Sequence, residues 1–408
     1  SEQWDRRLAL MREEFTRLHG VPGSEALGAR EWEAAVDGML RGAVENLGDP
    51  HSRYLDRAQA LDFQRESAGV SIGLGIYTER GTAGLRIHTL VPNSPAEKAG
   101  LLEDDEIVSI DDVALAGLDF NAMRQRLRKP AGEPLRLLIK RNGRTLQLTA
   151  ARGALQTPDP FSKMAAPGIG YVYFPEFDRS TDIKVFAAID GLKAKGARSV
   201  IIDVRGNPGG YAHIARSIAS EFLSDKEVID TMWRRGQVSE RARADGPGRY
   251  FGFPAAVLVD GDSASASEML AAALQALKRA VIVGSQTYGK GSFQAPGQIA
   301  ITNPDPDDCE ECLPFYPDGT AVLLTEGRWT TPQGRWVQGR HDEASGRNAP
   351  GSGGVIPDAI VDVSAAEQQA ARKTLLWQAH GRRPPPTRDR VLEKAVEVLA
   401  AASSRRSA

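Results

Sequence analysis

Two residue types with the chemistry of an acylating hydrolase lie close together between residues 257 and 294. The segment SASAS places three serines at alternate positions with Ser265 in the middle, and YGKGS places Lys290 between two glycines. A lysine accepts the proton of a serine hydroxyl only when burial lowers the lysine pKa far enough to leave the amine neutral. This stretch is therefore a candidate serine-lysine site, with Gln294 four residues after the lysine.

A strand and a helix must position that serine. Val257 to Val259 form a short apolar run typical of a strand buried on both faces, and residues 268–277 have the composition of a helix. A serine at such a turn exposes its hydroxyl at the carboxyl edge of a sheet, beside free backbone N–H groups and a positive helix dipole. The alternative is that the three serines are only N-cap candidates for the helix, because serine is a preferred cap.

Three separated motifs, SASASE, GKGSFQ and the upstream DVRGNPGG, together resemble the carboxy-terminal processing, or tail-specific, serine proteases. The resemblance implies that Ser265 is the nucleophile, Lys290 the general base and Gln294 the residue that orients the lysine. It also implies an α/β core of the ClpP/crotonase-like fold and an endopeptidase that cuts proteins with unstructured C-terminal tails through an acyl-enzyme. The alternatives are a catalytically inert PDZ scaffold or binding protein, and crotonase-type acyl-CoA chemistry, which shares the fold without the serine-lysine pair.

The glycine-rich segment RGNPGGYAH follows a predicted strand and precedes a predicted helix, so its N–H groups are candidates for stabilising an oxyanion. We predict donors from Gly209 or Gly210 together with Ala266; a simple tight turn is the alternative. A Ser-His-Asp triad built from His213 and Asp203 is disfavoured, since His213 is expected to face outward and Asp203 to act as a structural cap.

Short alternating strands between residues 67 and 152 resemble a PDZ domain. The segment IGLG, comprising Ile72, Gly73, Leu74 and Gly75, occupies the position of the carboxylate-binding loop, where glycines expose successive N–H groups to a peptide terminus. The chain departs from the family at Asp104, where a glycine is usual, and in the segment LRKPAGEP. Both changes are turn changes outside the predicted groove.

Length and composition favour several domains and exclude some partners. A chain of 408 residues is expected to form an N-terminal helical segment (1–66), an inserted mainly-β PDZ domain (67–155), the protease core (156–363) and a C-terminal helical tail (364–408). The N-terminal segment contains helical spacing at 3–18 and 28–47. A formal net charge of −2 provides no basic field for nucleic acid.

The remaining expectations concern cofactors, partners and location. The lone CxxC pair, Cys309 and Cys312, cannot complete a four-ligand zinc site, so we predict no metal or cofactor and favour a disulfide over free thiols or a redox pair. Expected partners are protein or peptide substrates with free, apolar C-termini, and a homo-oligomer formed through the terminal helices. The sequence has no transmembrane or signal segment, and the family resemblance implies a periplasmic or otherwise exported protein.

Overall fold

The structure is a computed structural model that describes residues 29–49, 51–67, 71–129, 131–155, 157–294, 320–342, 347–348, 351–384 and 387–407. The chain divides into two units. The first contains the described residues up to Ile72 and those within 129–133 and 293–326, and the second contains the rest. The predicted helix at 3–18 and the cysteine pair lie outside the described residues.

A six-stranded sheet forms the centre of the second unit, in the order β10-β11-β12-β15-β16-β22. The five strands from β11 to β22 are parallel, and β10 is an antiparallel edge strand. The first three parallel strands are buried at every position, because helices cover both faces of the sheet. The bounds are β10 (Phe161–Ala166), β11 (Ile169–Tyr173), β12 (Ser199–Asp203), β15 (Ala255–Val259), β16 (Ala280–Gly284) and β22 (Ala359–Ile360).

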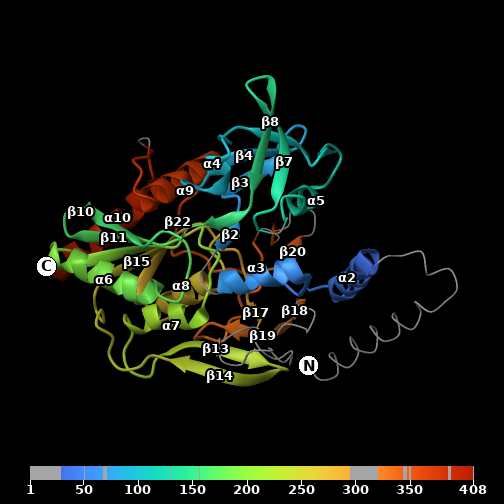
Figure 1. Ribbon diagram of the computed structural model, residues 1–408. Helices are drawn as coiled ribbons and strands as arrows, with labels where there is room; N and C mark the ends of the chain where they lie inside the picture. The colour runs from blue at the N-terminus through green and yellow to red at the C-terminus, as the bar shows by residue number, and fades with distance from the viewer. Residues whose placement is uncertain are drawn as a thin grey trace. The chain divides into compact units, whose positions relative to one another are not determined.

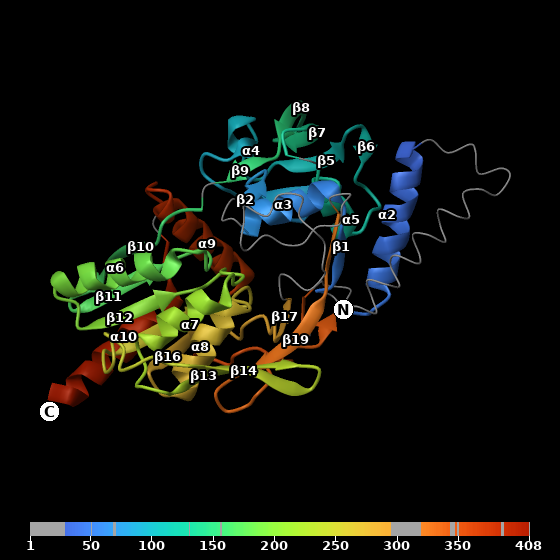
Figure 2. The ribbon, with the colours of Figure 1, turned by 60° about the horizontal axis from the view of Figure 1, so that its bottom comes forward.

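Helices cover both faces of this sheet (Figures 1 and 2). On one face Tyr171, Ile201 and Leu258 pack against the two C-terminal helices through Leu375 and Val391. The other face carries three helices that contact the sheet or one another, including the helix that follows the predicted nucleophile. The bounds are α6 (Thr181–Ala194), α7 (Ala212–Ser220) and α8 (Ala266–Ala276) on this face, and α9 (Ala365–Ala379) and α10 (Arg390–Ser407) on the first.

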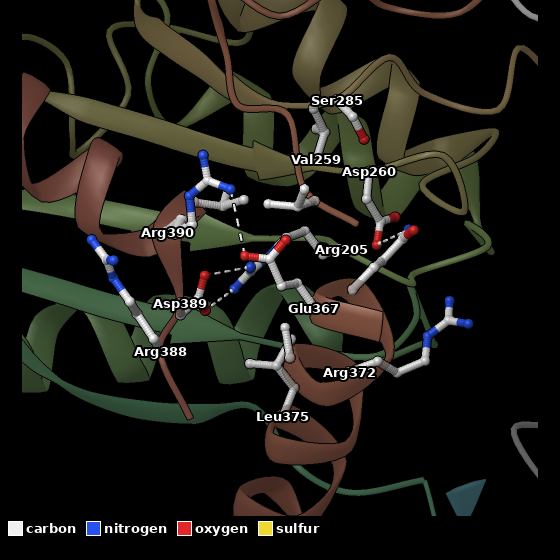
Figure 3. Close-up of a pocket in the computed structure, with 14 residues that line it drawn as sticks. Arg205, Val259, Asp260, Ser285, Glu367, Arg372, Leu375, Arg388, Asp389 and Arg390 are labelled. Atoms are coloured by element: carbon white, nitrogen blue, oxygen red, sulfur yellow. Dashed lines mark hydrogen bonds and ion pairs between the residues drawn. The ribbon is translucent and has the colours of Figure 1, made fainter. Parts of the chain in front are cut away.

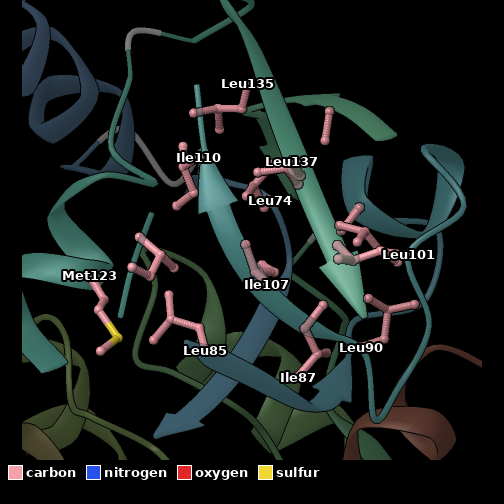
Figure 4. Close-up of a cluster of buried hydrophobic side chains, with 14 residues drawn as sticks. Leu74, Leu85, Ile87, Leu90, Leu101, Ile107, Ile110, Met123, Leu135 and Leu137 are labelled. Atoms are coloured by element: carbon pink, nitrogen blue, oxygen red, sulfur yellow. The ribbon is translucent and has the colours of Figure 1, made fainter. Parts of the chain in front are cut away.

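The same unit contains the predicted mainly-β domain, whose strands follow the order β3-β4-β5-β7-β8 with β6 beside β5. Strand β7 alternates exposed and buried residues, and its buried Leu135, Leu137 and Ile139 complete an apolar core (Figure 4). Strand β3 is an edge strand. The bounds are β3 (Ile76–Arg80), β4 (Leu85–Leu90), α4 (Pro95–Lys98), β5 (Glu106–Ile110), β6 (Val113–Ala114), α5 (Phe120–Gln125), β7 (Pro134–Arg141) and β8 (Arg144–Ala151), with β2 (Ser71–Gly73) paired to β9 (Gly153–Leu155).

The first unit is built around a short antiparallel pair of strands. Tyr54 lies opposite Val322 and packs with Leu40 and Val44 of the preceding helix. That helix is the one predicted at 28–47. The bounds are α2 (Ala29–Glu45), β1 (Arg53–Leu55), α3 (Arg57–Ser67) and β18 (Ala321–Leu323).

Two further strand groups complete the described structure. A four-stranded sheet has the order β14-β13-β19-β17, and a two-stranded ribbon pairs β20 with β21. Arg235 and Gly236 form the turn between β13 and β14, both with positive φ, as a tight hairpin turn requires. The bounds are β13 (Val228–Arg234), β14 (Gln237–Arg243), β17 (Ser292–Gln294), β19 (Thr325–Thr330), β20 (His341–Asp342) and β21 (Arg347–Asn348).

Candidate active site

The predicted nucleophile lies in a strained turn between β15 and α8. Ser265 is the residue immediately before α8 and has φ 54° and ψ −113°, a conformation that a non-glycine residue adopts only when its surroundings impose it. The backbone N–H of Ser265 donates to a Glu268 carboxylate oxygen at 2.9 Å. The turn therefore places a half-buried Ser265 directly before α8, with its backbone N–H bonded to Glu268.

The two flanking serines tie this turn to the glycine-rich segment after β12. The hydroxyl of Ser263 donates to the Val204 carbonyl at 2.8 Å, and the hydroxyl of Ser267 donates to the Asn207 carbonyl at 2.9 Å. Both serines are fully buried. Neither hydroxyl caps α8. The two outer serines anchor the turn, and the middle one, Ser265, is the only one of the three that is not fully buried.

The loop that carries the predicted base is bonded to the same turn. The Tyr288 N–H donates to the Ser263 carbonyl at 3.0 Å, and the Lys290 N–H donates to Glu268 at 2.8 Å. The indole of Trp329 donates to the Lys290 carbonyl at 3.0 Å. The backbone of the lysine is thus fixed on both sides.

Glu268 is the residue that joins the two loops. One carboxylate oxygen accepts from the N–H groups of Ser265 and Lys290, and the other accepts from the Gly289 N–H at 2.7 Å and the Thr287 hydroxyl at 2.5 Å. Burial raises the pKa of Glu268, and the four donors oppose that rise. Because all four donors point at the carboxylate, a proton on either oxygen would displace one of them, so the ionised form fits the site.

Sequence reasoning assigned no role to Glu268, although a signal was present. Ser265 and Glu268 stand in the S-x-x-E spacing of a capping box, in which the acidic side chain accepts from the N-cap N–H. The bond from Ser265 has that form. The further bonds to residues 287–290 could not be read from spacing, because they join segments about twenty residues apart.

The glycine-rich segment lies directly against the nucleophile. A Cβ placed on Gly209 would lie 2.8 Å from the Ser265 Cβ and 3.0 Å from the Ala266 nitrogen, so the structure brings these three predicted residues together. The Gly209 N–H donates to the Asn207 Oδ1 at 2.9 Å. Across the described residues, no hydrogen bond takes the N–H of Gly210 or of Ala266. Asn207, which sequence reasoning missed, therefore shapes this segment.

Substitution of Gly209 by alanine is expected to lower the rate of any reaction at Ser265 by about 100-fold, the usual cost of losing an oxyanion donor. The added methyl group would force the segment away from Ser265, since φ is 109° and the Ala264 carbonyl oxygen is 2.8 Å from the new atom. The control is Gly236→Ala, where φ is 78° but nothing lies within 4 Å. Steady-state kinetics that fall equally in both variants would contradict this role for the segment.

Asp203 belongs to a buried ion cluster. Its carboxylate accepts from the Tyr171 hydroxyl at 2.6 Å and from the Arg205 guanidinium, which also binds Asp389 beside the first turn of α10 (Figure 3). Burial raises the pKa of Asp203, and Arg205 opposes the rise. His213 instead lies beside the ring of Tyr211. This arrangement agrees with the structural role predicted for Asp203 and provides no support for a triad.

The predicted carboxylate-binding loop is bonded to the rest of the PDZ domain through its carbonyl groups. The carbonyl oxygens of Leu74 and Gly75 accept from Ala96 and Val91 at 2.9 and 2.8 Å, whereas no hydrogen bond within the described chain takes the N–H of Leu74 or Gly75. Gly75 has φ 78°, which a tight loop requires. Ile72 and Gly73 end the short strand β2 before this loop.

Asp104 and Gln294 both have polar partners. Asp104 has φ 67°, a left-handed conformation that glycine adopts without strain, and its carboxylate pairs with Arg86. Gln294 ends β17 and donates its side-chain amide to the Thr325 hydroxyl at 3.0 Å. Its predicted role toward Lys290 stays a prediction.

Comparisons with known proteins agree with the architecture. A family model described as "Peptidase family S41" matches residues 168–361, and a PDZ domain model matches residues 86–141. The fold class predicted from the sequence, an α/β protease core with a mainly-β PDZ domain, is confirmed. A solved structure of a photosystem II D1 C-terminal processing protease is similar over 82% of this chain and 83% of that chain, with 26% sequence identity and a TM-score of 0.54.

Two curated bacterial proteins are also similar. The carboxy-terminal-processing protease of Bartonella bacilliformis is 30% identical over 82% of this chain and 70% of its own length. The carboxy-terminal processing protease CtpA of Bacillus subtilis is 30% identical over 74% of this chain and 61% of its own length. The similarity thus spans about 60% of the length of the Bacillus subtilis relative.

Proposed function

Because the chain belongs to the carboxy-terminal processing proteases of peptidase family S41, we propose that it is a serine endopeptidase that uses Ser265 and Lys290. The observation that carries the proposal is the carboxylate of Glu268, one oxygen of which accepts from the backbone N–H of both residues. That oxygen keeps the two backbone nitrogens within two hydrogen-bond lengths of each other. A shared acceptor of this kind fixes the position of one residue relative to the other, which a reaction that uses both side chains requires.

The reaction follows from these positions. The neutral Lys290 amine takes the proton of the Ser265 hydroxyl as the serine oxygen attacks the peptide carbonyl, and the N–H groups of Ala266 and Gly210 stabilise the oxyanion. Collapse of the intermediate breaks the C–N bond, and the lysine gives its proton to the leaving amine. Water then attacks the acyl-serine, with Lys290 again accepting the proton and returning it to Ser265. We assign to Gln294 the role of orienting the Lys290 side chain.

Incubation of the wild type and of Ser265→Ala with an unfolded protein, followed by mass spectrometry, tests the enzyme against the alternative of an inert PDZ scaffold. The proposal requires new peptide ends with the wild type only. A wild type that binds C-terminal peptides and produces no cleavage would establish the scaffold instead. Cleavage by both proteins would exclude Ser265 as the nucleophile.

We assign substrate selection to the PDZ domain. The N–H groups of Leu74 and Gly75, which no hydrogen bond within the described chain takes, suit a terminal carboxylate. The edge strand β3 suits an extended peptide that adds to the sheet. Ile72 and Gly73 complete the loop. The substrates are therefore proteins or peptides with free, apolar C-termini.

Amidation of a substrate's C-terminus is expected to weaken binding by about tenfold, because charge-assisted hydrogen bonds are roughly twice as strong as neutral ones. Binding of paired free-acid and amidated peptides to Ser265→Ala, measured by calorimetry, isolates this effect from cleavage. A second pair that ends in an apolar or a charged residue tests the preference for apolar tails. Equal affinities for free acid and amide would remove the assigned role of residues 72–75.

We propose that the protein is exported, in accord with the family and with the disulfide predicted from the sequence for Cys309 and Cys312. Within the described helices, none has the length and apolar character needed to cross a membrane. Fractionation of the native cells, with sizing of the purified protein, tests the location and a homo-oligomer formed through the terminal helices.

A further inference from the structure

Helix α9 contacts two functionally different parts of the second unit through adjacent stripes of side chains. Gln368 and Arg372 are four residues apart and form one stripe; Gln369 and Lys373 form the next. Leu375 anchors the helix in the core beside the central sheet. Figure 3 shows Arg372 and Leu375 on α9, and Asp260 on the neighbouring segment that follows β15.

The first stripe binds the turn that leads to Ser265. The Gln368 amide donates to Asp260 at 3.2 Å, and the Arg372 guanidinium pairs with Asp262 at 3.0 Å. Asp260 in turn accepts from the Gly206 N–H at 2.9 Å and the Ser263 N–H at 3.1 Å. The helix therefore supports both the nucleophile turn and the start of the glycine-rich segment.

The second stripe binds the PDZ domain by charge. Gln369 donates to Glu79 of β3 at 3.2 Å, and Lys373 pairs with Glu103. Beyond the end of α9, Arg382 binds both carboxylate oxygens of Glu97 at 2.7 and 2.8 Å. Basic and amide groups of the C-terminal segment thus meet acidic groups of the PDZ domain.

Arg372 is the residue that contacts both parts. Besides its pair with Asp262, its guanidinium carbon lies 5.5 Å from the ring centroid of Tyr77 in β3, within the range of a cation–π contact. A Cβ on Gly206 would lie 2.8 Å from the Arg372 side chain, so the guanidinium also packs on the glycine-rich segment. Only 22% of the Arg372 side chain is exposed, which limits screening of these contacts by solvent.

We propose that Arg372 is a positioning residue of the reaction, through which strand β3 of the PDZ domain acts on the turn that holds Ser265. The inference rests on the proposed function and deepens it. Strand β3 is the free edge to which an extended peptide would add, and Tyr77 is two residues beyond Gly75 on that strand. A peptide that adds to this edge binds the strand that carries Tyr77, and Tyr77 contacts Arg372. Arg372 in turn pairs with Asp262, which lies three residues before the nucleophile.

Double-variant kinetics on the full chain test the connection. Tyr77→Leu and Asp262→Asn are made singly and together, in the wild type and in Arg372→Lys, which keeps the charge and loses the planar guanidinium. In the wild-type background we expect non-additive effects on kcat, with a coupling of about fivefold or more and little change in KM. In the Arg372→Lys background the same pair is expected to be additive.

Lys373→Gln is the matched control. It removes a charge from the neighbouring position of the same helix, and its partner Glu103 belongs to the PDZ domain rather than to the catalytic turn. We expect it to leave the Tyr77–Asp262 coupling within about twofold of the wild-type value. Loss of the coupling in Lys373→Gln as much as in Arg372→Lys would assign the effect to general docking of α9 and overturn the role of Arg372.

Hydrogen exchange separates this inference from the proposed activity. Amide exchange at residues 262–268 is followed in the same variants, in a Ser265→Ala background that cannot hydrolyse peptides. We expect Tyr77→Leu to speed exchange at these residues when Arg372 is present and to have no effect on exchange when Arg372 is replaced by lysine. This result would support the inference even if no substrate is cleaved. Exchange that is unchanged by Tyr77→Leu, or changed equally with and without Arg372, would overturn it.

Discussion

Replacing Ser265 or Lys290 by alanine is expected to lower the rate of peptide cleavage by about four orders of magnitude, because nucleophile and base act as one unit. For the same reason the double variant is expected to lose no more than either single variant. Thermal unfolding should change little, since the Glu268 bonds use the backbone N–H of both residues and survive in the alanine variants. The measurement is single-turnover cleavage of a fluorogenic peptide, with melting curves of each variant.

The control for this experiment is Lys394→Ala, which removes a lysine that pairs with Glu397 on the surface of α10. It should retain full activity. Raising the pH should increase wild-type activity, because only the neutral amine accepts the serine proton. A Lys290→Ala enzyme with substantial activity, or two losses that multiply in the double variant, would show that the residues do not act as a pair.

Glu268→Gln is expected to lower the free energy of unfolding by about 2 kcal/mol or more and to reduce kcat with it. In the variant, the amide NH2 would face two N–H or O–H donors that bind a carboxylate oxygen in the wild type. Each buried polar group left without a partner costs about 1–3 kcal/mol. The loops of Ser265 and Lys290 would then separate. Chemical denaturation measures the first effect, and kinetics below the melting transition measure the second.

Glu367→Gln provides a close comparison. Glu367 has the same place in a capping box at the start of α9, accepting from the Ser364 N–H, but it is exposed. Its substitution is expected to change the free energy of unfolding much less than Glu268→Gln does and to leave kcat unchanged. If the two glutamine variants behaved alike, Glu268 would be an ordinary helix cap without a part in joining the catalytic loops.

The sequence was informative where function depends on residue type and local spacing. The run Val257 to Val259, the glycines after β12 and the alternating strands before residue 152 predicted the buried strand, the glycine-rich turn and the PDZ domain. These features depend on periodicities and backbone freedoms that a short window contains. The three motif segments also predicted a shared site, and Gly209 does lie against Ser265.

The supporting residues could not be found in the same way. Asn207, Thr287 and Arg372 act through hydrogen bonds or ion pairs to segments far away in sequence, so their roles depend on residues that a short window does not contain. An arginine on an amphipathic helix is ordinarily a solvated residue. Nothing in the sequence spacing of the two C-terminal helices distinguishes Arg372, on α9, from Arg390, on α10. The two partners of Arg372, Tyr77 and Asp262, lie in segments that are far apart in the sequence.

The ion cluster of Arg205 has a consequence for how the protein is made. Arg205 directly precedes the glycine-rich segment, and its second carboxylate partner, Asp389, follows 184 positions later. Ribosomes release a chain from its N-terminus, so β12 and the Ser265 turn are synthesised long before the first turn of α10. Until then the buried guanidinium has only Asp203 to balance it. We therefore expect nascent chains to complete this site only after Asp389 has been synthesised, so that the proposed nucleophile is assembled late relative to β12 and the Ser265 turn.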